Sequence, residues 1–199
     1  MTSGIVETAR ELAQRAHAGQ MRKAQEQPYF SHLQAVVGLL ATHGHTDDET
    51  LAAAYLHDLI EDQPAFSAEL HQRLPAEVVD TVRALTEPKQ DVAGGPRPKA
   101  ERFEAYLSGL SSGSLAARRA LPISCADKIH NALSLVDAEA SGEALLQRMS
   151  TRPSDQVPQL LRLRALYAGA VAPDLLAAFD AATEQLARTV AAWQATHPK

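Results

Sequence analysis

The chain has 199 residues, of which 45% are hydrophobic and 22% are charged, a balance typical of a globular protein in water. Its formal net charge of -5 argues against a general nucleic-acid binder, which needs a basic face for the phosphate backbone. The single cysteine, Cys125, excludes an internal disulfide, so we expect a core thiol and a cytoplasmic location. No signal-peptide pattern and no apolar run of membrane-spanning length is found.

The first part of the chain carries helix signals separated by one polar loop. Ala and Leu are abundant and alternating β-branched runs are absent, which favours helices over strands. We expect a first helix over residues 3–18, a loop over 20–30, and a second helix over 32–43 with Ser31 as its N-cap.

The middle of the chain combines helices with one long loop. Residues 87–98 hold three prolines and two glycines, and this most loop-like segment is a candidate lid. Pro122 lies inside the last helix predicted here and is expected to start or kink it. The helices expected in this region cover residues 67–74, 75–85, 99–110 and 115–140.

The C-terminal residues 142–199 are predicted to form two or three helices. Apolar side chains recur every three or four residues along the last one, at Leu175, Phe179, Ala182, Leu186, Val190 and Trp193. We interpret this stripe as core; the alternative is a seam between copies of the chain in a homo-oligomer. These patterns together predict an all-α fold with a single domain over residues 1–199.

An unusual group of charged side chains follows a helix that Thr46 or Asp47 can cap. Glu61 and Asp62 lie four residues after His57 and Asp58, so all four share one face of a continuous helix. Three carboxylates and one imidazole on an otherwise apolar helix repel one another and resist burial. A bound divalent cation would remove both problems, whereas the alternative is a solvated helix end.

Asp127 repeats this anomaly in a second segment. It lies in the largely apolar run 121–129, and Asn131 and Ser134 follow on the same helical face. An acid in such a run needs a partner, which is either a metal or a buried arginine.

A third segment contains cations before a histidine. Arg22 and Lys23 suit phosphate groups, and an arginine can also stack on a base. His32 begins a helix beside apolar neighbours; taken alone, it is more typical of a core histidine than of a ligand.

The order of His32, then His57 and Asp58, then Asp127 resembles the metal site of HD-domain phosphohydrolases. Four motifs extend the likeness: Ala-His-x-Gly-Gln-x-Arg-Lys, Pro-Tyr-Phe-x-His, Leu-His-Asp-x-Ile-Glu-Asp and Ala-Asp-Lys-x-His-Asn. They are similar to the hydrolase domain of the RelA/SpoT group, and the short length is similar to its single-domain members. The resemblance covers about residues 9–136, and the helices of 142–199 match poorly.

This resemblance implies an HD-type helical bundle that binds one divalent metal, usually manganese, and a small purine nucleotide. It implies the following roles: metal ligands His32, His57, Asp58 and Asp127; orientation and deprotonation of the attacking water by Glu61 and Asp62; substrate binding by Arg22, Lys23, Asn131 and Ser134. Lys128 and Arg102 are further candidates for offsetting charge on the transferred group. Relatives carry aromatic residues near 160–167, where this chain has only Tyr167.

The activity implied is removal of the 3′-pyrophosphate from an alarmone, ppGpp giving GDP and pyrophosphate, which ends or tunes the stringent response. The same site could instead act on adenine alarmones or on the 2′-phosphate of NADPH. Another HD chemistry, such as that of a 5′-nucleotidase, is a third reading. A non-catalytic nucleotide-sensing module is a fourth, although clustered Glu61 and Asp62 argue against it. Neither nucleic acid nor a membrane is expected as a partner.

Overall fold

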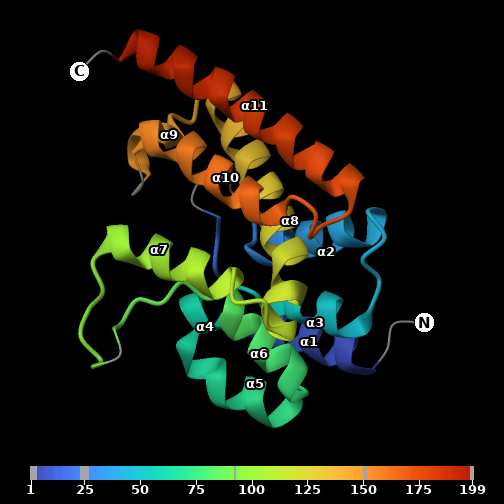
Figure 1. Ribbon diagram of the computed structural model, residues 1–199. Helices are drawn as coiled ribbons and strands as arrows, with labels where there is room; N and C mark the ends of the chain where they lie inside the picture. Colours follow the sequence, from blue (N-terminus) through green and yellow to red (C-terminus); the bar gives the residue numbers. More distant parts are fainter. Residues whose placement is uncertain (1–3, 23–26, 92, 150–151, 198–199) are drawn as a thin grey trace.

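The computed structural model describes residues 4–22, 27–91, 93–149 and 152–197, and most of these are helical (Figure 1). Within those ranges, extended pairing is limited to two isolated bridges, Met21 with Pro28 and Gln90 with Pro96. The all-α prediction is therefore confirmed. No helix in the described ranges combines the length and apolarity that crossing a membrane requires.

The elements follow one another along the chain as helices joined by turns and loops. The first half contains α1 Gly4–Ala16, α2 Phe30–Thr42, α3 Asp48–Leu56, α4 Leu59–Asp62, the 3-10 turn η1 Pro64–Phe66, α5 Ser67–Arg73 and α6 Ala76–Leu85. The second half contains α7 Lys99–Leu110, α8 Leu115–Ala140, α9 Leu145–Arg148, α10 Pro153–Tyr167 and α11 Pro173–Thr196. The predicted helix over 99–110 has these same bounds, and the C-terminal segment contains three helices, within the expected range.

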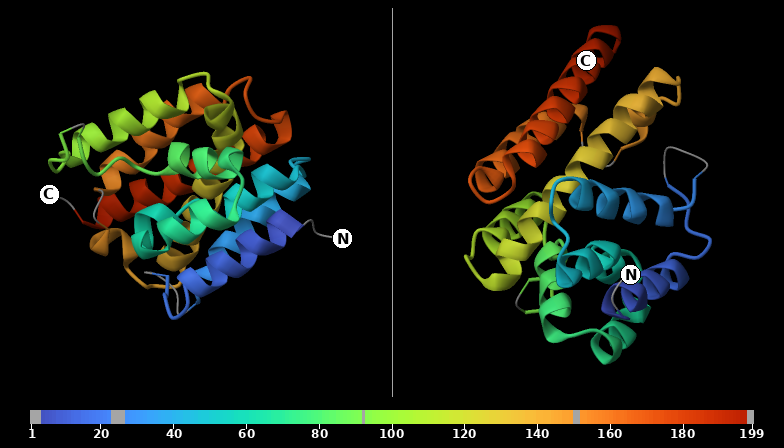
Figure 2. Two further views of the ribbon diagram at one scale, coloured as in Figure 1. Left: turned by 90° about the horizontal axis from the view of Figure 1, so that it is seen from below. Right: turned by 90° about the vertical axis from the view of Figure 1, so that its right-hand side faces the viewer.

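Helix α8 runs through the centre of the molecule and organises the core (Figures 1 and 2). It packs against α2 and α6 on one side and against α10 and α11 on the other. Residues 120–126 are all buried, as expected for a helix segment that is apolar on every face. Cys125 lies in this segment, so the expectation of a core thiol is confirmed.

The apolar stripe of α11 packs inside the chain. Leu175, Phe179 and Leu186 are buried, and α11 rests on α8 and α10. The interpretation of this stripe as core is confirmed. These three side chains are covered by contacts within one chain and are not exposed for contact with a second copy.

Of three helix starts, two agree with expectation and one differs. Asp47 does cap α3, accepting a hydrogen bond from the Thr50 backbone N–H at 3.0 Å. Ser31, however, does not cap α2: the backbone already turns at Pro28 and Tyr29, and the Ser31 hydroxyl donates to the Pro28 carbonyl. By contrast, α8 spans Leu115–Ala140, as expected, and runs through Pro122 instead of starting there. Pro122 is buried inside this helix, although it has no N–H to donate to the preceding turn.

Candidate metal and substrate site

The His57–Asp58 pair lies in a turn between α3 and α4, and the prediction of a continuous helix here is wrong. Asp58 adopts φ -98° and ψ -1°, outside regular helix geometry, and the helix resumes where the Asp62 N–H donates to the Asp58 carbonyl at 2.9 Å. The break turns the two side chains toward α2 and α8.

Four side chains from three parts of the chain converge at this turn. His57 Nε2 lies 3.0 Å from Asp58 Oδ2 and 3.6 Å from Asp127 Oδ1 of α8. His32 Nε2 of α2 lies 3.7 Å and 3.2 Å from the same two oxygens. His32, His57 and Asp58 can offer ligand atoms that all lie within 4.8 Å of one another. The four residues expected to ligate a metal are therefore brought together.

The tautomer of His57 suits a metal. His57 Nδ1 contacts the Ala54 carbonyl at 2.8 Å, and since a carbonyl only accepts, this nitrogen carries the proton. His57 Nε2 is buried and has no hydrogen-bond partner among the described residues. A buried imidazole lone pair facing two carboxylates is what a metal ion would satisfy. The donor set therefore fits a divalent cation.

A hydrogen bond with His130 likewise fixes the tautomer of His32, and the sequence did not predict this role for His130. Arg22 can only donate, and it contacts His130 Nδ1 at 3.1 Å, so this nitrogen is an acceptor. His32 Nδ1 lies 2.9 Å from the same atom and must donate to it. The lone pair is then on Nε2 of His32, the nitrogen that lies beside Asp58 and Asp127. The helical spacing of His130, three residues after Asp127, was the signal available in the sequence.

Tyr29 is a second residue without a predicted role. Its hydroxyl donates to Asp58 Oδ2, and its ring stacks on His17 with centroids 4.9 Å apart. Burial, together with the charge of Asp58, raises the pKa of Tyr29, so it stays a donor. Its place in the Pro-Tyr-Phe-x-His motif was the only sign in the sequence.

The charges at the centre favour a bound cation. Burial opposes ionisation of Asp58, but His57 and a hydrogen bond from His32 hold the pKa of Asp58 below its usual range. Burial likewise opposes ionisation of Asp127, and Lys128 with the two histidines keeps its pKa low. Burial alone would lower the pKa of His57. Asp58 and Asp127 raise it by more than burial lowers it, so the net shift is upward. Two ionised carboxylates thus demand a positive charge, which is either a proton or a metal ion.

Glu61 and Asp62 line the cavity beside this centre. Glu61 Oε2 accepts from the Glu87 backbone N–H at 3.4 Å, and Lys89 Nζ lies 3.4 Å from Oε1. Burial raises the pKa of Glu61, and Lys89 counteracts part of that rise. Asp62 Oδ2 accepts from Gln20 Nε2 at 2.9 Å, which fixes its orientation.

The residues expected to bind substrate also contact the centre. Arg22 donates to Asn131 Oδ1 at 3.0 Å, and Asn131 donates to Asp127 Oδ1 at 2.6 Å, so Asn131 orients a predicted metal ligand. The Ser134 hydroxyl lies 3.4 Å from His130 Nδ1. Arg22, Asn131 and Ser134 all line the cavity, whereas Lys23 lies outside the described residues.

Of the two further cations, one reaches the site. Lys128 Nζ contacts Asp127 Oδ2 at 2.7 Å and lines the cavity, so the partner of Asp127 is a lysine instead of a buried arginine. Arg102 instead donates to the Arg97 carbonyl at 2.8 Å and is not among the lining residues.

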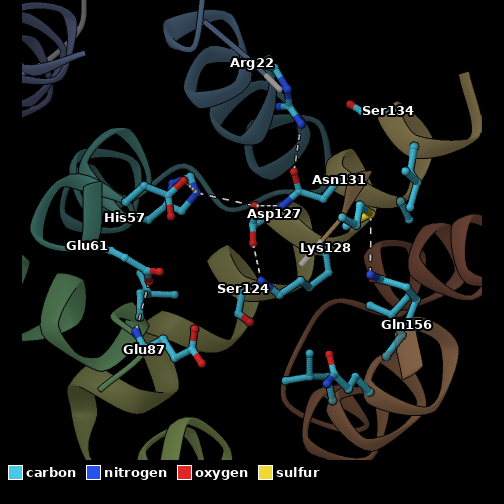
Figure 3. A pocket seen from close by; sticks show the side chains of 18 of the residues that line it. Arg22, His57, Glu61, Glu87, Ser124, Asp127, Lys128, Asn131, Ser134 and Gln156 are labelled. Carbon is cyan, nitrogen blue, oxygen red and sulfur yellow. Dashed lines mark hydrogen bonds and ion pairs between the residues drawn. The ribbon is translucent and has the colours of Figure 1, made fainter. Parts of the chain in front are cut away.

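These side chains surround a cavity of about 620 Å³ (Figure 3). Its lining comes from the loop before α2, the α3–α4 turn, α4, the end of α6 and the residues after it, α7, α8, α9 and the residue after it, α10 and α11. Figure 3 places His57, Glu61 and Glu87 on one side, Asp127 and Lys128 in the middle, and Gln156 opposite. The volume is within the range of small-ligand sites.

The sequence profile of the HD domain family matches residues 9–152. The chain belongs to the HD domain family. Its curated relatives include GTP pyrophosphokinase rsh of Brucella ovis, 35% identical over 114 residues, which cover 57% of this chain and 14% of that protein. Bifunctional (p)ppGpp synthase/hydrolase SpoT of Escherichia coli is 34% identical over 121 residues, covering 60% of this chain and 16% of that one. This HD domain chain therefore spans a small part of the length of the curated relatives it matches.

Solved structures share the HD domain fold over most of the chain. A metazoan ortholog of SpoT, described as hydrolyzing ppGpp, superposes with a TM-score of 0.72 at 24% identity, covering 93% of this chain and 97% of that one. A protein of Listeria monocytogenes gives a TM-score of 0.62 at 22% identity over 83% of this chain and 99% of that one. At these identities the likeness shows the fold alone. It does confirm the predicted HD-type helical bundle.

Proposed function

We propose that this HD domain protein hydrolyses the 3′-pyrophosphate of an alarmone nucleotide, converting ppGpp to GDP and pyrophosphate. The observation that carries the proposal is the convergence of His32, His57, Asp58 and Asp127, the last three of which line one cavity together with Glu61 and Asp62. The likeness to SpoT-type proteins supports the choice of an alarmone as substrate.

In this proposal His32, His57, Asp58 and Asp127 hold one divalent ion. Two imidazoles and two carboxylates suit Mn, Fe or Zn, and we propose Mn²⁺. When bound, the ion supplies Lewis-acid activation of water and of a phosphoryl oxygen. Tyr29 and Asn131 keep the two carboxylates oriented through hydrogen bonds, and His130 keeps His32 in its ligating tautomer.

Glu61 is the proposed general base. Because its pKa is raised by burial, it accepts a proton more readily than an exposed glutamate does at neutral pH. Asp62, fixed by Gln20, orients the attacking water. The water oxygen bonds to the phosphorus that carries the 3′ oxygen, the bond from phosphorus to that oxygen breaks, and the 3′ oxygen leaves with a proton. Pyrophosphate and a nucleoside 5′-diphosphate are the products.

Arg22 and Lys128 provide the positive charge that the transferred group needs. Arg22 lines the cavity and is held by Asn131 and His130, so its guanidinium is already in place when substrate arrives. Lys128 is paired with Asp127 on the same cavity wall. Both cations stabilise a transition state in which negative charge develops on phosphoryl oxygens.

The test is turnover of the Mn²⁺-loaded protein with ppGpp, ppApp and NADPH in parallel, measuring released pyrophosphate and phosphate. Pyrophosphate from ppGpp is the expected result. Release of phosphate from NADPH alone would mean that the substrate is NADPH instead of an alarmone. No product from metal-loaded protein would refute the proposal in favour of a binding module. The paired variant Glu61→Gln, Asp62→Asn should lose turnover while keeping metal. A cytoplasmic location and a homo-oligomeric state stay predictions.

A further inference from the structure

The cavity has two chemically different ends. The charged lining residues, among them Arg22, Glu61 and Lys128, gather at the metal end. By contrast, every described lining residue between 145 and 163, contributed by α9, α10 and the connection between them, is uncharged: Leu145, Met149, Gln156, Gln159, Leu160 and Leu163. A phosphate group at this second end would meet no cationic side chain from these helices. The end suits a flat, neutral group with polar edges.

Two glutamines supply the polar groups of α9 and α10 at this end. Gln156 and Gln159 lie three residues apart, on the same face of α10 as Leu160 and Leu163. Among described side chains, the Gln156 amide donates a hydrogen bond only to the Met149 sulfur, at 3.7 Å, and a thioether is a weak acceptor. The Gln159 amide makes no side-chain hydrogen bond within the described ranges.

A carboxamide presents a donor and an acceptor side by side, which matches the hydrogen-bonding edge of a nucleobase. The neighbouring leucines offer apolar contact to the faces of a base. Gln156 also lies across the cavity from His57 and Glu61, with Asp127 between them (Figure 3). A nucleotide whose phosphates lie at the metal end would therefore extend its base toward α10.

We propose that Gln156 and Gln159 bind the edge of the nucleobase and set the base preference of this protein. This inference rests on the proposed function, because it takes the ligand to be a nucleotide with its phosphates at the metal centre. In the variant lacking both amides, Gln156→Leu with Gln159→Leu, two neutral hydrogen bonds are lost. The affinity for a nucleotide should then fall about 10- to 100-fold.

The experiment is calorimetric titration of the Mn²⁺-loaded protein with GDP, ADP and inorganic pyrophosphate. The double leucine variant should bind both nucleotides more weakly and pyrophosphate as the wild type does. Gln185→Leu, at an exposed position of α11, is the matched control and should change none of the three. Unchanged nucleotide binding, or an equal loss for pyrophosphate, would overturn the inference.

A second variant pair excludes a merely structural effect. In Gln156→Glu with Gln159→Glu, each amide becomes an acceptor only, which favours the donor-rich edge of guanine over adenine. The ratio of GDP to ADP affinity should rise, and an unchanged ratio would count against base contact. Wild-type protein that binds nucleotides through these glutamines but releases no pyrophosphate would refute the proposed reaction and leave this inference standing.

Discussion

Replacing His130 should weaken metal binding although His130 is not itself a proposed ligand. In the variant His130→Leu, the N–H of His32 Nδ1 loses the acceptor that lies 2.9 Å away. His32 is 1% exposed, so water cannot easily take the place of that acceptor. An unpaired buried donor costs about 1–3 kcal/mol, which matches the roughly 10- to 100-fold loss of metal affinity usual when such an orienting partner is removed.

The assay is a competition titration of Mn²⁺ against a fluorescent chelator, with circular dichroism to verify the fold. The variant His130→Gln restores an acceptor oxygen and should recover part of the affinity. His43→Leu is the matched control, because His43 Nδ1 bonds the Leu39 carbonyl of its own helix. A dissociation constant for His130→Leu within twofold of the wild type would show that His130 does not orient His32.

Three further predictions concern pH, the core and the metal. Lys89→Met removes the cation that lowers the pKa of Glu61, so that pKa rises. Since the base acts in its ionised form, the acidic limb of the activity profile should move to higher pH than in the wild type. The pH profile of kcat/KM measures this, and an unmoved acidic limb would contradict it. Ser124→Ala removes hydrogen bonds of 2.7 Å to Tyr106 and to the fully buried Tyr167, and should destabilise the fold by about 2–4 kcal/mol in urea unfolding. Tyr167→Phe removes one of these bonds and should cost less; the reverse order would refute this account. Chelation should remove about 2.7 kcal/mol of stability when metal had been present at 100 times its dissociation constant, which lowers Tm by roughly 5–10 °C. An unchanged Tm would mean that the folded chain holds no metal.

Much of the fold follows from local pattern. The bounds of α7, the Asp47 cap and the core stripe of α11 are all consequences of helical periodicity and capping, which act over a few residues. Where long-range packing competes with these local signals, the prediction is wrong. The Pro28–Tyr29 turn, for example, starts α2 before Ser31.

The residues of the candidate site also fall into those that the sequence identified and those that only the tertiary structure showed. The sequence alone, through its ordered motifs, identified His32, His57, Asp58 and Asp127 as one group, and the described chain does bring them together. Only the tertiary structure decided which side chains hold them there. Tyr29 and His130 take their roles from contacts with segments far apart in the chain, which no periodicity records, whereas Asn131 contacts Asp127 one turn away on the helical face that they were expected to share. The break at His57 and Asp58 is of the same kind, because the buried polar groups that it gathers find their partners on α2 and α8, far away in the sequence.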